Sequence, residues 1–165
     1  MSVAWGVEVS VDGETGAVAA ARPRGGGLWM VELVFYQPAP LLPGALGDLY
    51  DADEESVGVF ADPMPCAGIL DALRHRLWLH TLEAVDVAAA ASQFRAAVKM
   101  REVQAVSHPA LEQALTFAVQ RPLATAFGYE RRKVAADMAP LNAAAFALWG
   151  ARRNEGGGDP GAWLI

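Results

Sequence analysis

The chain has 165 residues, 53% hydrophobic and 19% charged, which suits one packed domain and excludes a disordered chain. Cys66 is the only cysteine, so an internal disulfide and a thiolate-rich zinc site are excluded, and a reducing compartment is favoured. The net charge of −6 argues against tight autonomous DNA binding, and no segment has the pattern of a signal peptide or the ~20 apolar residues of a membrane-spanning helix.

The first third of the chain predicts an antiparallel meander. Residues 3–10, 17–22 and 28–36 have strand patterns and are separated by turns rich in glycine and aspartate. The proline-rich segment 37–44 cannot continue a sheet, and residues 45–56 predict a short helix that runs into an acidic loop.

The middle of the chain alternates strands and helices. Residues 57–63 (VGVFADP) predict a short strand buried on both faces, which is typical of a central or parallel strand. A helix over 66–76, a strand within 77–85 and a long alanine-rich helix over 86–102 follow. In the last of these, the spacing places Ala90, Phe94, Ala97 and Val98 on the inner face.

The final part predicts a helix within 108–119, with proline near its start, and a loop or hairpin over 121–134. A closing helix is expected from about Pro140 to Arg152. We expect one domain over residues 1–153 and a flexible C-terminal tail over 154–165.

The order of elements predicts an α/β fold on the ribonuclease H-like plan: a mixed five-stranded sheet, three antiparallel strands then parallel strands, flanked by helices. In that plan the first strand is central and the next crossover strand lies beside it. Ligands gather outside the carboxyl ends of such strands.

Three carboxylates interrupt segments that should otherwise be buried: Glu8, Asp62 and Asp137. Charged groups are rarely buried unless they are paired or bind a metal. The predicted fold makes Glu8 and Asp62 neighbours near strand ends, with Asp137 at the start of the closing helix. Carboxylates on different elements can hold two Mg²⁺ or Mn²⁺ ions that hydrolyse a phosphodiester bond. We therefore predict all three as catalytic, metal-binding residues, with Glu8 or Asp62 bridging and Asp137 completing the second site.

Each carboxylate also has a purely structural explanation. Glu8 fits a solvent-facing strand face, Asp62 before a proline fits a strand end, and Asp137 fits a helix cap. For each carboxylate taken alone, the structural explanation is at least as good as a catalytic role. Only the placement of all three on neighbouring elements of one fold favours a metal site. Asp12 fits a turn residue better than a spare ligand, because it precedes Gly13.

Other chemistries have little support. The three histidines are scattered, no serine lies in a nucleophile elbow, and the two GGG segments lack the lysine of a phosphate-binding loop. The sequence thus predicts neither serine hydrolysis nor an ATP site.

Three segments resemble the C-terminal nuclease domain of tailed-bacteriophage large terminase subunits: GVEVSVDGETGAVAAA, VGVFADPMPCAGILDAL and RRKVAADMAPLNAAAFALWG. The region between the last two is similar in order and spacing, so the resemblance spans roughly residues 3–151. It implies a metal site at Glu8, Asp62 and Asp137, where Glu8 replaces a common aspartate.

The resemblance also implies cleavage of concatemeric double-stranded DNA during genome packaging, in the cytoplasm of an infected bacterium. The implied partners are an ATPase motor, in the same protein or in trans, the small terminase subunit and the portal, with no membrane. These would position the DNA despite the acidic net charge. Arg131, Arg132 and Lys133 are candidate phosphate contacts, and their alternative is an exposed, solvated hairpin.

Two other functions stay open. A junction resolvase would share the fold but should be dimeric and more basic. A non-catalytic packaging or scaffolding module would bind no metal and would tolerate Asp62→Asn.

Overall fold

The computed structural model describes residues 2–76, 78–123 and 126–155. The strands are, in chain order, β1 (Val3–Val9), β2 (Thr15–Gly25), β3 (Leu28–Pro38), β4 (Ser56–Ala61), β5 (Leu79–Thr81), β6 (Val103–Ala105), β7 (Gln120–Leu123) and β8 (Ala126–Tyr129). The helices are α1 (Leu42–Ala52), α2 (Ala67–Leu73), α3 (Ala84–Lys99), α4 (Pro109–Thr116) and α5 (Ala139–Glu155), with a 3₁₀ turn at Ala39–Leu41. No helix within the described ranges is long and apolar enough to cross a membrane.

Six strands form one mixed sheet in the order β5-β4-β1-β2-β3-β6. β1 is central: it pairs antiparallel with β2 and parallel with β4, and β5 continues parallel to β4. This is the predicted ribonuclease H-like plan, with one strand more than expected. The extra strand, β6, has three residues and pairs parallel with β3 at the edge. Three residues carry too little periodicity to be predicted from sequence.

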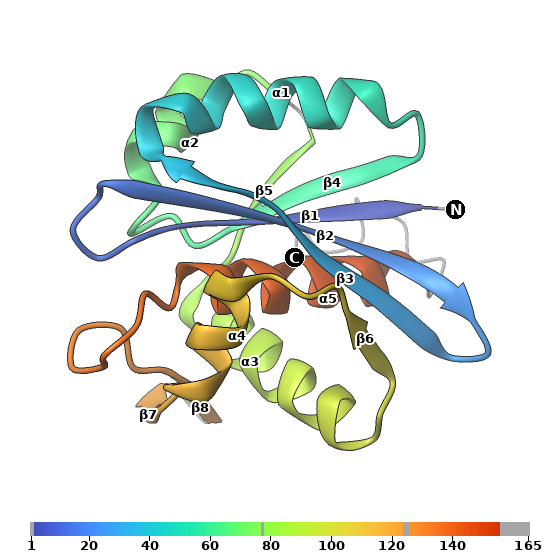
Figure 1. The fold of residues 1–165 in the computed structure, drawn as a ribbon. Helices are drawn as coiled ribbons and strands as arrows, with labels where there is room; N and C mark the ends of the chain where they lie inside the picture. Colours follow the sequence, from blue (N-terminus) through green and yellow to red (C-terminus); the bar gives the residue numbers. More distant parts are fainter. Residues whose placement is uncertain (1, 77, 124–125, 156–165) are drawn as a thin grey trace.

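Helices cover both faces of the sheet. Figure 1 shows α1 and α2 on one face and α3, α4 and α5 on the other. The predicted loop or hairpin over 121–134 contains a hairpin, β7–β8, which forms a separate two-stranded sheet. The predicted strand within 77–85 is confirmed but covers only Leu79–Thr81.

Several boundaries differ from the predictions. β3 continues through Pro38 and α1 begins at Leu42, so both enter the proline-rich segment 37–44 that was expected to end the sheet. Pro43 lies in the first turn of α1, where its missing N–H costs little. α5 continues through Glu155, so residues 154 and 155 belong to the helix rather than to a tail, and residues 156–165 lie outside the described part. In α3, Ala90, Phe94 and Ala97 are buried as predicted, but Val98 is 45% exposed. The inner face of α3 is therefore narrower than its apolar spacing indicates.

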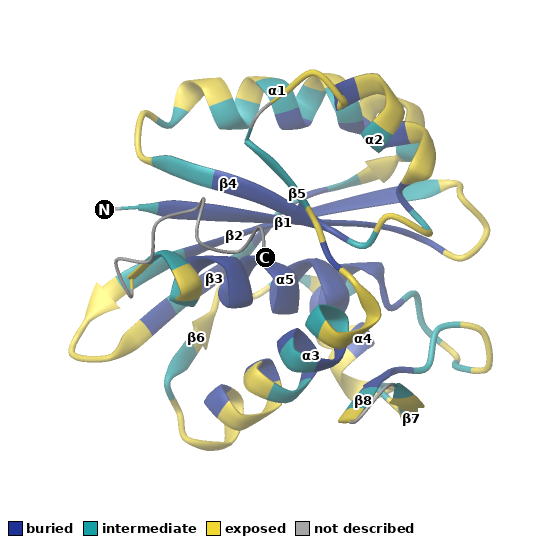
Figure 2. Ribbon diagram, turned by 180° about the vertical axis from the view of Figure 1, so that it is seen from behind, coloured by how far each residue is buried: buried dark blue, intermediate teal, exposed yellow. Residues whose placement is uncertain are grey.

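α5 lies against the centre of the sheet. Its residues from Ala139 to Ala151 are all buried, as Figure 2 shows by its dark colour. Small side chains allow this close approach: a Cβ added at Gly6 of β1 would lie only 1.9 Å from the carbonyl oxygen of Ala143. On the opposite face of β1, larger apolar side chains pack with α1 and α2: Val3, Trp5, Val7 and Val9. The tight contact between β1 and α5 positions the site described below.

Candidate active site

Glu8 is a charged residue type placed inside the core. It follows Ala4 and Gly6 on the β1 face that α5 covers, and it is 1% exposed. The solvent-facing explanation of Glu8 is therefore wrong. Its Oε1 accepts a hydrogen bond from the Val9 backbone N–H at 3.0 Å, and its Oε2 accepts one from Nδ2 of Asn142 on α5 at 3.3 Å.

Asp62 lies beside Glu8, directly after β4. The parallel register pairs Val7 with Ala61, so the next residue of each strand reaches the same carboxyl edge of the sheet, as predicted. The Asp62 Oδ1 accepts the backbone N–H of Met64 at 3.0 Å, which fits the turn expected of an aspartate before proline. Its other carboxylate oxygen, Oδ2, lies near the guanidinium of Arg131.

Arg131 joins the two carboxylates. Its Nη2 lies 3.1 Å from Oε1 of Glu8 and also donates to the Val9 carbonyl at 3.2 Å. Its Nη1 lies 3.9 Å from Oδ2 of Asp62. The arginine side chain is 18% exposed, so the ion pair with Glu8 is largely shielded from water. Breaking such a buried pair on one side leaves an uncompensated charge, which is strongly destabilising.

Burial dominates the electrostatics of Glu8. Loss of hydration raises the pKa of Glu8 to about 8, although Arg131 and the Val9 N–H lower it. Cys66 is buried with its Sγ 3.8 Å from Oε1 of Glu8. Burial, and then the carboxylates of Glu8 and Asp62, raise the pKa of this thiol, which keeps it neutral.

Asp137 reaches the site from the loop before α5. Its Oδ1 accepts the backbone N–H of Ala139, the first residue of the helix, at 2.9 Å. Its Oδ2 accepts the hydroxyl of Tyr36 on β3 at 3.0 Å. Burial, and then the Asp137 carboxylate, raise the pKa of Tyr36 to about 12, so the phenol stays a donor. Asp137 is thus held at the helix start, as its structural explanation requires.

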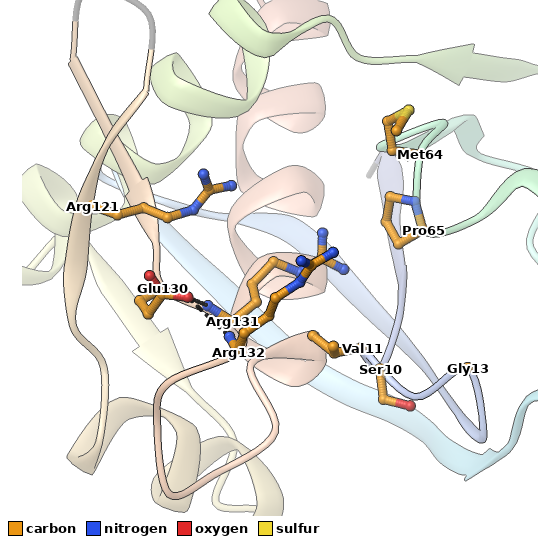
Figure 3. A pocket seen from close by; sticks show the side chains of 9 residues that line it. All are labelled: Ser10, Val11, Gly13, Met64, Pro65, Arg121, Glu130, Arg131 and Arg132. Carbon is orange, nitrogen blue, oxygen red and sulfur yellow. Dashed lines mark hydrogen bonds between the residues drawn. The ribbon is translucent and has the colours of Figure 1, made fainter.

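Two hollows open at this edge of the sheet. The larger, of about 540 Å³, lies between the β7–β8 hairpin and the Met64–Pro65 segment, and Arg131 and Arg132 extend into it (Figure 3). It is lined by Ser10, Val11, Gly13, Met64, Pro65, Arg121, Glu130, Arg131 and Arg132. The smaller, of about 330 Å³, is lined by Ser10, Val11, Asp12, Thr15, Tyr36, Arg131, Arg132 and Asp137.

The two hollows share Ser10, Val11, Arg131 and Arg132, and neither Glu8 nor Asp62 lines them. Asp137 is therefore related to the pair Glu8–Asp62 through Arg131, which contacts both carboxylates and lines the hollow that Asp137 borders. Lys133 is exposed on the following turn of the loop and does not line either hollow. Asp12 accepts hydrogen bonds from the Ser10 hydroxyl at 2.5 Å and the Glu14 N–H at 3.0 Å, which confirms its role in the turn.

Metal ligation by the three carboxylates stays a prediction. Within residues 2–76, 78–123 and 126–155, no three His, Cys, Asp or Glu side chains lie close enough together to hold a metal ion. The donors themselves suit Mg²⁺ or Mn²⁺, because carboxylate oxygens are their preferred ligands. A cation also already lies between Glu8 and Asp62, since the Arg131 guanidinium contacts both. The donor types therefore fit a divalent ion, and in this structure the guanidinium of Arg131 lies between two of the carboxylates.

Three supporting residues escaped the sequence analysis. Asn142 was detectable in principle, as the one strongly polar residue in the apolar run PLNAAAFALWG. Tyr36 and Arg121 carry no such signal, because their contribution depends on how β3 and the β7–β8 hairpin pack around the site.

No family model and no curated protein is significantly similar to this chain. Among solved structures, the fold is similar to the crystal structure of the HK97 bacteriophage large terminase, with a TM-score of 0.68 and 15% sequence identity. The chain shares the fold of part of a large terminase. The similarity covers 92% of this chain and 40% of the terminase chain, so this chain corresponds to less than half of that protein. The resemblance predicted from sequence is thereby confirmed at the level of the fold.

Proposed function

We propose that this chain is the metal-dependent endonuclease domain of a phage DNA-packaging terminase, which cuts concatemeric DNA by phosphodiester hydrolysis. One observation carries the proposal: Glu8 and Asp62 lie side by side at the carboxyl ends of two parallel strands and share one cationic partner. Asp137 borders a hollow that Arg131 also lines, and the terminase-like fold supports the same assignment.

Glu8, Asp62 and Asp137 would hold two Mg²⁺ or Mn²⁺ ions. When bound, these ions activate water and stabilise the leaving oxygen of an in-line displacement. Asn142 fixes the Glu8 carboxylate through Oε2, and Tyr36 fixes the Asp137 carboxylate through Oδ2. Such outer partners orient ligands and tune their affinity.

The DNA would lie along the larger hollow. Its lining contains three arginines against one glutamate, so the surface is locally positive although the chain carries −6. Arg121 and Arg132 would bind phosphate oxygens and set the position of the strand, since backbone contacts fix register without reading sequence. The rest of the DNA-binding affinity would come from a motor, small subunit and portal.

Plasmid cleavage tests this function. Supercoiled DNA is incubated with the protein and Mn²⁺, Mg²⁺ or EDTA, comparing wild type with Asp62→Asn. Asp71→Asn is the matched control, because Asp71 lies exposed on α2 and pairs with Arg74 at the surface. We expect metal-dependent nicking in wild type and the control, and none in Asp62→Asn with an unchanged circular dichroism spectrum. Cutting that survives Asp62→Asn would reject this site.

A non-catalytic packaging module is the second candidate. It is favoured by the guanidinium of Arg131, which already compensates Glu8 and Asp62 without a metal. This candidate predicts no Mn²⁺ binding in a calorimetric titration, whereas the nuclease predicts binding that Asp62→Asn weakens.

A further inference from the structure

The guanidinium of Arg131 lies between two carboxylates, although Arg131 belongs to an irregular loop rather than to a strand or helix. It belongs to the residues that join β8 to α5. The start of this loop is fixed, because Oε1 of Glu130 accepts the backbone N–H groups of Arg131 and Arg132, each at 2.9 Å. The long side chain of Arg131 can therefore turn about a fixed backbone.

The guanidinium and a divalent ion compete for the same oxygens. Nη2 contacts Oε1 of Glu8 at 3.1 Å and Nη1 faces Oδ2 of Asp62 at 3.9 Å. A cation that binds between these two carboxylates must displace the guanidinium, because like charges at such distances repel strongly in a site shielded from water.

The displaced side chain can turn toward either hollow, because Arg131 lines both. The smaller hollow contains the carboxylates of Asp12 and Asp137. In the larger hollow, the guanidinium would turn toward two other positive groups, Arg121 and Arg132. That arrangement is unfavourable in the empty hollow. It becomes favourable when an anion such as a phosphate lies among the three arginines, because charge-assisted hydrogen bonds then compensate them.

We propose that Arg131 acts as a latch. In the free protein its guanidinium blocks the cation site between Glu8 and Asp62, and it turns into the larger hollow when a DNA phosphate binds there. This inference rests on the proposed function and assigns its regulation. Cation and phosphate binding then strengthen each other, and the coupling is reciprocal. An isolated domain with no DNA would hold metal weakly and would avoid cutting at random.

The first test is calorimetric titration with Mn²⁺ of wild type, Arg131→Gln and Lys133→Gln. Lys133→Gln removes the same charge from the same loop at an exposed residue that lines neither hollow, so it controls for the electrostatic field of a nearby cation. We expect Arg131→Gln to bind Mn²⁺ roughly tenfold more tightly than wild type, within the range of ordinary coupling. Lys133→Gln should stay within about twofold, as an exposed charge is well screened. Equal affinities in the two variants overturn the latch.

Sulfate serves as the phosphate probe for the coupling. Added sodium sulfate, compared with sodium chloride at equal ionic strength, should tighten Mn²⁺ binding in wild type and leave Arg131→Gln unchanged. An equal response of both proteins to sulfate overturns the coupling.

A measurement on wild type covers the case in which Arg131→Gln does not fold. The Nε–Hε signal of Arg131 is followed by NMR during addition of Mg²⁺, with Arg152, paired to Glu102 at 2.6 Å, as the internal reference. The latch requires the Arg131 signal to shift while that of Arg152 stays. An unmoved Arg131 signal at Mg²⁺ saturation overturns the latch.

The outcomes separate this inference from the proposed function. Tighter Mn²⁺ binding by Arg131→Gln with no plasmid cutting supports the latch and rejects the nuclease. Metal-dependent cutting with equal Mn²⁺ affinities supports the nuclease and rejects the latch. Absence of Mn²⁺ binding in every variant rejects both.

Discussion

The side-chain amide of Asn142 on α5 donates a hydrogen bond to Glu8 on β1, with Nδ2 3.3 Å from Oε2. The two residues are 134 positions apart in the chain and both are buried, with exposures of 5% and 1%. This bond joins the central strand to the helix that covers it, at the point where the candidate site begins.

Asn142→Ala should destabilise the protein by about 1–3 kcal/mol, because a buried acceptor loses its donor. Urea unfolding measures the change. Asn154→Ala is the control: Asn154 lies near the end of the same helix and donates to the Gly150 carbonyl at 2.9 Å. That change should cost less than about 0.5 kcal/mol, as for most surface substitutions. If both variants lose the same free energy of unfolding, the hydrogen bond between Asn142 and Glu8 adds no more stability than a contact near the helix end.

Gly6→Ala tests the contact between β1 and α5. The new Cβ would lie 1.9 Å from the Ala143 carbonyl oxygen and 2.5 Å from the Ala147 nitrogen, so the helix must move off the sheet. We expect a loss of about 3 kcal/mol or more, at the upper end of overpacking costs. Since the shift also separates Asn142 from Glu8, metal binding should weaken in parallel.

Gly44→Ala is the matched control for Gly6→Ala. Gly44 lies in α1 with open space around its Cα, so an added methyl meets no neighbour. It should stabilise the protein by about 0.5–1 kcal/mol through helix propensity. A Gly6→Ala protein as stable as wild type would contradict the close packing of α5.

The sequence was informative where a pattern is local. Alternation and turn residues predicted the meander, and helical spacing predicted α3, α4 and α5. The carboxylates were found because a charge in an apolar run is an exception, and the fold plan then placed Glu8 beside Asp62. The edge strand β6 was missed, because its pairing with β3 is decided by tertiary contacts rather than by its own three residues.

The role of Arg131 was not predictable in the same way. In RRKV it reads as one of three equivalent exposed cations, and a phosphate contact was predicted for all of them. The fold distinguishes them: Arg131 turns inward to Glu8, Arg132 lines the hollows, and Lys133 does neither. Which member of a basic run is buried depends on the path of the loop, and no periodicity encodes that path.

Tyr36→Phe tests the support of Asp137. The change removes the hydroxyl that Oδ2 accepts at 3.0 Å, so the carboxylate loses one of its two orienting bonds. If the proposed nuclease holds, the rate of plasmid nicking should fall about tenfold, as for outer partners of metal ligands. Tyr50→Phe is the control, because its hydroxyl makes a long 3.4 Å contact to the Ser56 carbonyl far along the chain from Asp137. Equal nicking rates in the two variants would remove Tyr36 from the site.

Arg121→Gln and Arg132→Gln test the proposed DNA path. Fluorescence anisotropy of a labelled duplex in EDTA measures binding without cleavage, at several salt concentrations. Each substitution should weaken binding and reduce the slope of log affinity against log salt by about one. Arg74→Gln, an exposed change on the α2 side of the sheet, should leave the slope unchanged. A slope that depends on Arg74 as much as on Arg132 would place the DNA elsewhere.

His80 on β5 makes the free energy of unfolding depend on pH, independently of the residues of the candidate site. Its ring stacks on Phe60 with centroids 4.8 Å apart, and burial lowers its pKa below the ordinary 6.5. A histidine with a lowered pKa binds fewer protons folded than unfolded. Its contribution to stability is therefore complete above about pH 6.5 and is lost as the pH falls through the folded pKa.

Glu8 acts in the opposite sense over the same range, because its raised pKa of about 8 makes the folded state bind more protons than the unfolded state. The effect of His80 is therefore measured as a difference: relative to wild type, the urea midpoint of His80→Gln should rise on acidification from about pH 7.5 to about pH 5. His75→Gln is the control, because His75 is exposed beyond the end of α2 and its substitution should leave the pH profile parallel to wild type. A midpoint of His80→Gln that falls relative to wild type on acidification would reverse the sign required by burial of a neutral imidazole. A profile changed equally by both substitutions would assign the effect to surface charge rather than to the stacked ring.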